Sequence, residues 1–285
     1  MTDRYVEILG ARLRYRREGH GPNVLLVHGL GASLEIWNWT VPALRESYTA
    51  VALDFPGFGR SEALNSALTP DGAARVILAF MDALDLQTTA IIGSSLGGGI
   101  ATLAAGTAPA RFTAVVLADP AGFDTGLNRL MRLQTLRGLG EITISLARFA
   151  PQLALGFTFH NPRRIPVELV QITRENAKRR VTGRTYLRAL RTSATLDGIR
   201  LESVYAVRQS AARIAAPALV VWGDKDAVIP PDQAEVAVQT IPGAKLVVMP
   251  GTGHVPFVED PETFNRALLA FLAEAVDRAP ASVAR

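Results

Sequence analysis

The sequence predicts an α/β protein in which a mostly parallel central sheet is flanked by helices and carries an inserted helical cap. Three observations predict this fold class. Short apolar runs alternate with helix-periodic segments along most of the 285 residues. The apolar runs are continuous rather than alternating, which indicates strands buried on both faces, as in a parallel sheet covered by helices. The alternation stops once, between about residues 123 and 213, where no buried strand is predicted.

Six continuous apolar runs are predicted to form the strands of the sheet. Each run ends at Gly, Asp or Pro, the residue types that close a strand and begin a turn. The opening segment 5–19 instead alternates apolar and polar residues about a Gly10-Ala11 turn, which predicts an antiparallel hairpin at the edge of the sheet. The six runs span residues 23–29, 49–57, 88–94, 113–122, 218–224 and 244–251.

Helix-periodic segments fill the intervals between these strands. Residues 123–213 form the longest such tract, which is rich in Leu and Arg and has proline breaks. Because strand–helix alternation resumes at Ala218, we expect residues 1–122 and 214–285 to form one core domain and residues 123–213 to form a helical cap over it. The other helices are predicted at residues 69–85, 96–109, 230–242 and 261–279.

Composition and charge exclude several classes of protein. The chain has no cysteine, which excludes disulfides and a thiol nucleophile. No secretory signal and no run of about 18 apolar residues is visible, so we expect a cytoplasmic protein without stable membrane insertion. Residues 123–213 hold sixteen Lys and Arg against six Asp and Glu. These cations are spaced among leucines as on solvated helix faces, and no nucleic-acid motif accompanies them, so no nucleic-acid partner is expected.

The segment GSSLG at residues 93–97 lies where a predicted strand meets a predicted helix. A Gly-x-Ser-x-Gly pattern at such a junction is typical of a turn so sharp that its central residue is strained and its neighbours two positions away need to be glycine. The central hydroxyl then projects at the carboxyl edge of the sheet, beside the free N–H groups of a helix. We therefore predict Ser95 as a nucleophile, and Ser94 as a packing or hydrogen-bonding neighbour.

A serine nucleophile needs a base, and the base needs a group that orients it. Of the four histidines, His254 follows the last predicted strand in a Gly-rich loop that can reach across the sheet edge, so we predict it as the base. His28 ends a strand and is predicted to steady its loop. His20 is predicted on the surface, and His160 in the cap is either a surface residue or part of a pocket.

Several aspartates follow predicted strands and could orient the base. Asp226, after the penultimate strand, is our prediction. Asp224 follows the same strand so closely that a turn role is more natural, and Asp119 remains a second alternative because a carboxylate there could also approach His254. Asp54 is predicted to anchor the turn 54–61.

Two N–H donors are expected to face the negative charge that develops on a substrate oxygen. We predict that Leu96, directly after Ser95, supplies one backbone N–H. Leu30, in the loop after the strand 23–29, is predicted to supply the other.

These motifs together resemble the α/β-hydrolase fold family, over nearly the whole chain apart from the cap. The resemblance implies an α/β-hydrolase fold with a helical lid, a triad of Ser95, Asp226 and His254, and an oxyanion hole at Leu30 and Leu96. Epoxide hydrolases and haloalkane dehalogenases of this family carry aspartate as nucleophile, so the serine argues against both. The matching segments, in order, are HGLG at 28–31, DFPGFGRS at 54–61, GSSLGG at 93–98, GDKDAVIP at 223–230 and GTGHVPFVEDPE at 251–262.

We expect a serine hydrolase that cleaves carboxylic esters with apolar acyl or alcohol groups and needs no metal or organic cofactor. Trp37 and His160 are predicted to line its substrate pocket. The expected partner is a small-molecule ester, and the chain is expected to be a monomer or homodimer.

Four alternatives remain open. One is a carbon–carbon bond hydrolase of ring-fission diketone acids, with a cap arginine on the carboxylate, although Val255 stands where such enzymes often have an aromatic residue. A second is an acyltransferase or perhydrolase with the same triad. A third is a ligand receptor with negligible turnover. The last is membrane attachment through residues 127–140, although their apolar spacing is more typical of a lid helix over the pocket.

Overall fold

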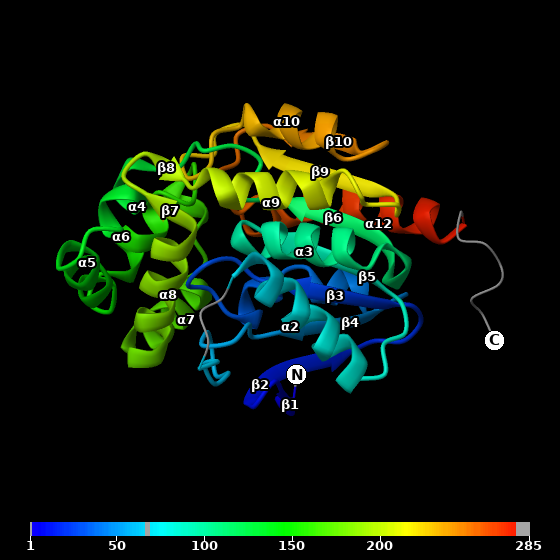
Figure 1. Cartoon of the computed structure of the whole chain (residues 1–285), viewed down its shortest axis with the longest axis horizontal. Coiled ribbons are helices and arrows are strands. Elements are labelled where there is room, and N and C mark those ends of the chain that lie inside the picture. The colour runs from blue at the N-terminus through cyan, green and yellow to red at the C-terminus, as the bar shows by residue number, and fades with distance from the viewer. Residues whose placement is uncertain (1, 66–68, 278–285) are drawn as a thin grey trace.

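The computed structural model describes residues 2–65 and 69–277. Its centre is an eight-stranded sheet in the order β1-β2-β4-β3-β5-β6-β9-β10, with helices on both faces (Figure 1). Strand β2 is antiparallel to β1 and β4, and the other neighbours are parallel. The predicted fold class is therefore confirmed. The strands are β1 Arg4–Ile8, β2 Ala11–Glu18, β3 Asn23–Val27, β4 Thr49–Leu53, β5 Thr89–Ser94, β6 Phe112–Ala118, β9 Ala218–Gly223 and β10 Lys245–Met249.

The central strands are buried on both faces, as their continuous Val, Ile, Leu and Ala content predicts. Strand β10 differs, because it is the last strand of the sheet and leaves Leu246 and Val248 exposed. The predicted hairpin exists, but its turn is Leu9-Gly10 rather than Gly10-Ala11, since Ile8 pairs with Ala11. Both turn residues have positive φ, as a two-residue hairpin turn of this hand requires, and Ala11 is left to pack in the core.

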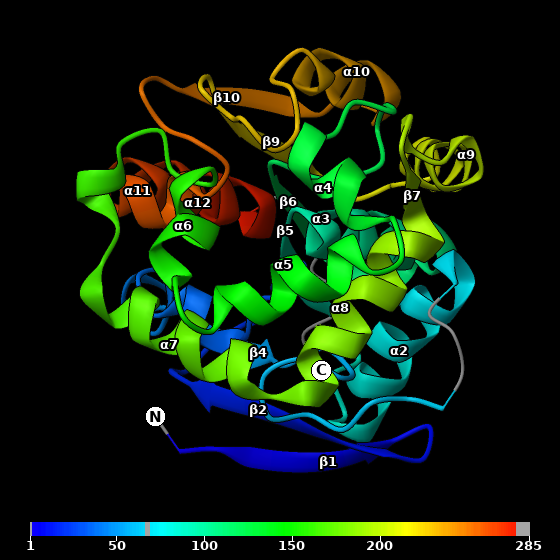
Figure 2. The ribbon, with the colours of Figure 1, turned by 90° about the vertical axis from the view of Figure 1, so that its left-hand side faces the viewer.

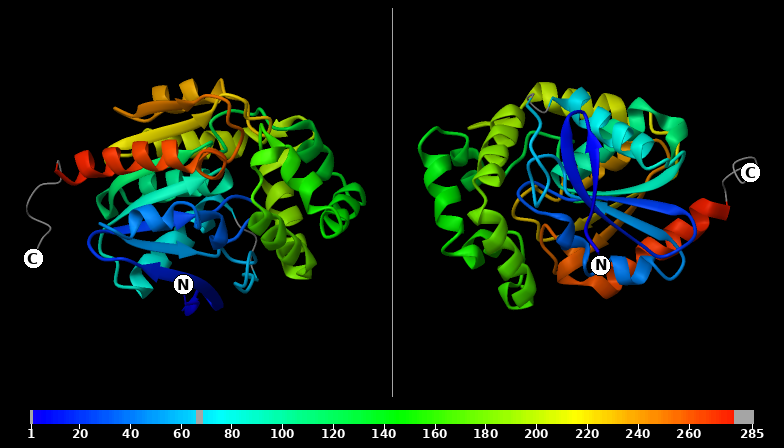
Figure 3. Two further views of the ribbon diagram at one scale, coloured as in Figure 1. Left: turned by 180° about the vertical axis from the view of Figure 1, so that it is seen from behind. Right: turned by 90° about the horizontal axis from the view of Figure 1, so that it is seen from below.

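Two layers of helices cover the sheet. Helices α2, α3, α9 and α10 contribute to the core on one face, and α1, α11 and α12 contribute to the core on the other (Figure 3). The Thr69 hydroxyl caps α2 by accepting from the N–H of Gly72, and Pro70 follows at the first helical position. The bounds are α1 Val41–Leu44, α2 Pro70–Ala83, α3 Leu96–Thr107, α9 Leu201–Ala211, α10 Gln233–Thr240, α11 Pro256–Glu259 and α12 Pro261–Asp277, with short 3₁₀ helices at η1 Leu34–Trp37 and η2 Pro109–Arg111.

A group of helices between β6 and β9 stands at one end of the sheet (Figure 2). Residues from these helices line one cavity together with residues that follow β3, β5, β9 and β10, so they lie over the carboxyl ends of those strands. The range 123–213 for the cap stays a prediction, and α9 within that range packs against α3 (Figure 1). The elements are α4 Arg129–Gln134, α5 Leu139–Ala147, α6 Pro151–Gly156, η3 Pro162–Arg164, α7 Val167–Lys178, α8 Arg180–Ser193 and a short strand pair, β7 Ala194–Thr195 with β8 Gly198–Ile199.

Candidate active site

Ser95 occupies the turn between β5 and α3 in a strained backbone conformation, with φ 55° and ψ −123°. A side chain at Gly93 would place its Cβ 2.3 Å from the carbonyl oxygen of Gly97, and one at Gly97 would lie 2.3 Å from the carbonyl oxygen of Val27. Both positions therefore need glycine, as the Gly-x-Ser-x-Gly pattern predicts. The turn is held by the Ser95 N–H, which donates to the carbonyl of Ala118 at 3.0 Å.

The loop after β3 packs directly against this turn. A Cβ at Gly29 would lie 3.0 Å from the Cβ of Ser95, so the next residue, Leu30, is close to the serine and lines the same cavity. On the other side, Leu96 is the first residue of α3, and an N–H at that position has no acceptor one turn back in the helix. The two predicted oxyanion donors thus belong to the two segments that flank Ser95.

His254 and Asp226 form a buried hydrogen-bonded pair. Nδ1 of His254 lies 2.7 Å from Oδ2 of Asp226. The other carboxylate oxygen accepts from the N–H groups of Val228 and Ile229 at 2.7 and 3.0 Å, which fixes the orientation of the carboxylate. With Nδ1–H donated to Asp226, the free basic nitrogen of the imidazole is Nε2.

Glu259 holds the His254 loop against the cap, a role that the sequence analysis missed. Its buried carboxylate accepts three backbone N–H groups, from Gly253 at 2.8 Å, His160 at 3.0 Å and Asn161 at 2.7 Å. The N–H of His254 also donates to the carbonyl of Thr158 at 2.7 Å. The only signal in the sequence was an acidic residue next to the apolar run 256–258.

Asp119 lies beside the His254–Asp226 pair. One oxygen or nitrogen atom from each of the three side chains lies within 4.8 Å of the others. Oδ1 of Asp119 accepts from the N–H of Gly223 at 2.9 Å, and Oδ2 accepts from no described donor. Burial, with the nearby Asp226 carboxylate as a smaller cause, raises the pKa of Asp119 well above its usual range, so its carboxyl group holds a proton more tightly than an exposed aspartate does.

The same three side chains have the atom types that a metal site would need. However, Nδ1 of His254 and Oδ2 of Asp226 are already joined by their hydrogen bond. Both oxygens of Asp226 are therefore in use, which fits an orienting carboxylate better than a ligand set.

The remaining strand-end residues have structural roles, as predicted. The carboxylate of Asp54 accepts from the N–H groups of Leu34 and Arg60, both at 2.7 Å, and Asp224 accepts from the N–H of Gly251 at 2.6 Å. Nδ1 of His28 donates to the carbonyl of Gly29, and its Nε2 accepts from the N–H of Phe55. Burial lowers the pKa of His28, so the ring is neutral and fixes its loop.

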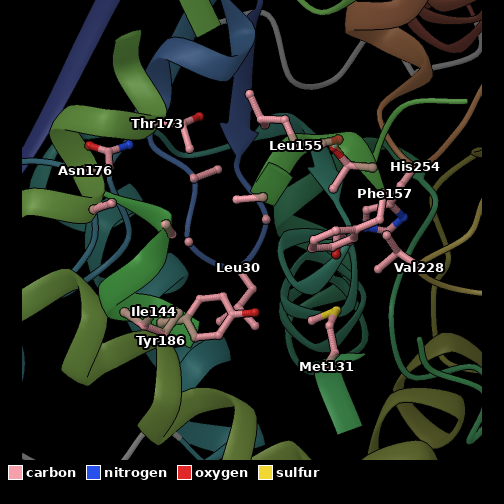
Figure 4. A pocket seen from close by; sticks show the side chains of 18 of the residues that line it. Leu30, Met131, Ile144, Leu155, Phe157, Thr173, Asn176, Tyr186, Val228 and His254 are labelled. Carbon is pink, nitrogen blue, oxygen red and sulfur yellow. Dashed lines mark hydrogen bonds between the residues drawn. The ribbon is translucent and has the colours of Figure 1, made fainter. Parts of the chain in front are cut away.

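A cavity of about 390 Å³ separates the cap from the sheet. Ser95 and His254 both line it, and the rest of its wall is mostly aliphatic and aromatic. In Figure 4, Thr173 and Asn176 lie on one side of the cavity and His254 on the other. Among the lining residues in the described ranges there is no Lys, Arg, Asp or Glu, so the wall offers a ligand no permanently charged side chain.

The two residues predicted to bind substrate lie elsewhere. Trp37 is fully buried and stacks on Phe257 at 4.5 Å between ring centroids, within the core between the sheet and α12. His160 is exposed, and its backbone N–H serves the Glu259 contact. Neither is among the residues that line the cavity, so we do not include them in a substrate site.

Comparison with known proteins agrees with this architecture. Residues 22–261 match the alpha/beta hydrolase fold family, and the chain belongs to that family. This confirms the resemblance that the sequence motifs indicated. In the part of the chain that the structure describes, no helix combines the length and apolarity needed to cross a bilayer.

Individual relatives carry different activities. The chain is 31% identical over 279 residues to the dihydrolipoyllysine-residue acetyltransferase component of the acetoin cleaving system of Cupriavidus necator, covering 93% of this chain and 67% of that protein. It is 26% identical over 270 residues to a monoacylglycerol lipase of Homo sapiens, covering 90% of this chain and 77% of the lipase. A meta-cleavage product hydrolase from Pseudomonas fluorescens shares the fold with a TM-score of 0.81 at 23% identity, covering 95% of this chain and 98% of that one.

Proposed function

We propose that this protein hydrolyses carboxylic esters with apolar acyl or alcohol groups. The observation that carries the proposal is that Ser95, on its strained turn, and His254, held by Asp226, line one apolar cavity. The kinship with a monoacylglycerol lipase supports an ester as the substrate.

The proposed reaction uses a covalent intermediate. His254 Nε2 removes the proton from the Ser95 hydroxyl, whose oxygen attacks the ester carbonyl carbon. The resulting oxyanion accepts hydrogen bonds from the N–H groups of Leu30 and Leu96. The imidazolium, stabilised by Asp226, returns its proton to the departing alcohol, and water then opens the acyl-enzyme with the same base.

The neutral cavity favours an uncharged substrate over a ring-fission diketone acid. A carboxylate inside the cavity would lose its hydration without a cationic partner, because none of the cap arginines is among the lining residues in the described ranges. The likeness to the meta-cleavage product hydrolase therefore supports the fold, but it does not support cleavage of a carbon–carbon bond by this protein.

Acyl transfer is a second candidate, because the relative from Cupriavidus necator carries an acetyltransferase name. The same acyl-enzyme would then pass its acyl group to an alcohol or thiol instead of water. Product analysis in the presence of a competing alcohol separates the two: hydrolysis gives the free acid as the main product, and transfer gives the new ester.

A series of p-nitrophenyl esters from acetate to palmitate tests the proposal. Ser95→Ala should lower kcat/KM by about 10⁴-fold or more, because it removes the attacking atom. Ser94→Ala removes the neighbouring hydroxyl from the same cavity and should cost less than about tenfold. Wild-type rates in Ser95→Ala, with loss of activity in Ser94→Ala, would contradict the assignment of the nucleophile.

A further inference from the structure

The outer surface of α4, α5 and α6 is unusually apolar. Sixteen large hydrophobic side chains are exposed in the described chain, and eight of them fall within residues 130–153. Phe149 and Leu153 are 71% and 77% exposed. Helix α5 contacts both α4 and α6, so the helices that carry most of these side chains pack together. We call this set the outer cap face: Leu130, Leu133, Leu136, Leu139, Ile142, Leu146, Phe149 and Leu153.

Helix α5 is apolar on two sides. Thr143, Ile144 and Ala147 line the cavity on its inner side. Leu139 and Ile142, three positions apart, are exposed on its outer side. A helix with two apolar sides normally has both sides covered, whereas here Leu139 and Ile142 are left exposed. The helix also lies at the end of the molecule opposite the C-terminal end of α12 (Figure 1).

The charges within residues 129–153 are almost all positive. Arg129, Arg137 and Arg148 are exposed, and the guanidinium of Arg148 lies 4.5 Å from the ring centroid of Phe149. The one acidic residue between positions 129 and 153 is Glu141, and Arg191 neutralises it through two hydrogen bonds of 2.8 and 2.9 Å. A second copy of this face would bring like charges together, whereas an anionic lipid surface offers both phosphates for the arginines and acyl chains for the leucines.

Three residues of the outer cap face also belong to the wall of the cavity. Leu130, Leu146 and Leu153 line the cavity, yet they are 41%, 57% and 77% exposed. Side chains that belong to both the wall of a cavity and the molecular surface mark its mouth. An apolar ester that leaves a lipid layer at this mouth would reach Ser95 without passing through water.

We propose that the outer cap face docks on anionic lipid surfaces, and that the cavity takes its ester substrate from the lipid layer. The second part of the proposal depends on the proposed ester hydrolysis, whereas the docking does not. Because the apolar residues are side chains on short helices, the contact is peripheral, at the depth of the headgroups and upper acyl chains.

Vesicle sedimentation of the full chain tests the docking. The protein is mixed with vesicles of equal parts phosphatidylcholine and phosphatidylglycerol, and in parallel with phosphatidylcholine alone. Ser95→Ala is used so that hydrolysis does not alter the lipid. We expect binding to the mixed vesicles that falls with added salt, and binding to the neutral vesicles that is at least about tenfold weaker.

Two double variants separate this face from exposed apolar residues in general. Ile142→Gln with Phe149→Gln removes two side chains of the outer cap face that do not line the cavity, and should weaken vesicle binding at least about tenfold. Leu201→Gln with Tyr205→Gln removes two equally exposed side chains on α9 and should bind within about twofold of the parent. Equal losses in both double variants would overturn the proposal.

Two further results would also overturn it. One is the absence of binding by the parent protein to the mixed vesicles. The other is a dimer in analytical ultracentrifugation that only the Ile142 and Phe149 changes dissociate, since the face would then join two copies of the chain. The two double variants are also made in the enzyme that retains Ser95, and their rates of p-nitrophenyl acetate hydrolysis should equal that of the enzyme without these changes. Vesicle binding without any ester hydrolysis would remove the proposed function and leave the docking intact.

Discussion

Asp119 and Asp226 follow neighbouring strands of the sheet, β6 and β9, and only Asp226 holds the imidazole of His254. Asp119 instead accepts from the N–H of Gly223, and its burial raises its pKa above the usual range. The two carboxyl groups therefore differ in their hydrogen-bond partners although they share one buried site. This difference supports the proposal that Asp226, rather than Asp119, orients the base.

Exchange of each carboxyl group for an amide should separate these roles. Asp226→Asn should lower kcat by about 10⁴-fold, because an amide stabilises the wrong tautomer of His254 and cannot stabilise its charged form. Asp119→Asn keeps an acceptor for the N–H of Gly223 and leaves the His254–Asp226 hydrogen bond in place, so its kcat should stay within about tenfold of wild type. Steady-state kinetics on a soluble p-nitrophenyl ester measures both. A larger loss in Asp119→Asn would make Asp119 the acid of the triad.

Asp119 should also make stability depend on pH. Its folded pKa lies above the ordinary value of 3.8, so the folded protein keeps a proton that the unfolded chain loses. This contribution is fully present below pH 3.8 and is lost as the pH rises through the folded pKa. We expect Asp119→Asn to gain free energy of unfolding relative to wild type as the pH is raised from 4 toward 8 in urea titrations. A difference that is constant across this range would contradict the raised pKa of Asp119.

The nucleophile turn should tolerate no side chain at Gly97. Gly97→Ala places a methyl group against the carbonyl oxygens of Val27 and His28, at 2.3 and 2.5 Å. We expect it to lower the free energy of unfolding by about 1–3 kcal/mol or more and to displace Ser95 enough to abolish activity. Gly156→Ala is the matched control, because a Cβ there meets nothing within 4 Å. Urea unfolding and ester hydrolysis of the two variants decide the point.

Glu259 should support activity without touching substrate. Glu259→Gln keeps one acceptor oxygen for three N–H groups and introduces an amide donor with no partner assigned to it. We expect a loss of about 1–3 kcal/mol in the free energy of unfolding, and a fall in kcat greater than any change in KM, because the His254 loop loosens. Glu262→Gln, at an exposed ion pair with Arg266, should change neither by a measurable amount.

Much of the fold could be predicted because burial on both faces leaves a continuous apolar pattern in each central strand. The placement of Ser95, Asp226 and His254 at strand ends followed from local turn chemistry. Contacts between distant segments could not be predicted in this way. Trp37 lies in the core, where it stacks on Phe257, a residue 220 positions later in the chain. The sequence pattern around residue 37 does not indicate such a distant partner.

The same limit applies to Glu259 and to the cap. The N–H groups of His160 and Asn161 lie 99 and 98 positions before Glu259, and backbone donors leave no mark in a sequence. The strands β7 and β8 have two residues each, too few for any pattern. The sequence did mark the Leu- and Arg-rich segment, but whether its leucines face a cavity or the solvent depends on how α4, α5 and α6 pack.

The hydrogen bonds from the backbone of residues 160 and 161 to Glu259 attach the cap to the loop of His254. A rigid-body movement of the whole cap away from the sheet would break the hydrogen bonds of Glu259 to residues 160 and 161 or displace His254 from Asp226. Substrate entry and product exit should therefore depend on movement of parts of the cap that Glu259 does not hold, such as α5. His254 can then keep its hydrogen bond to Asp226 throughout the catalytic cycle.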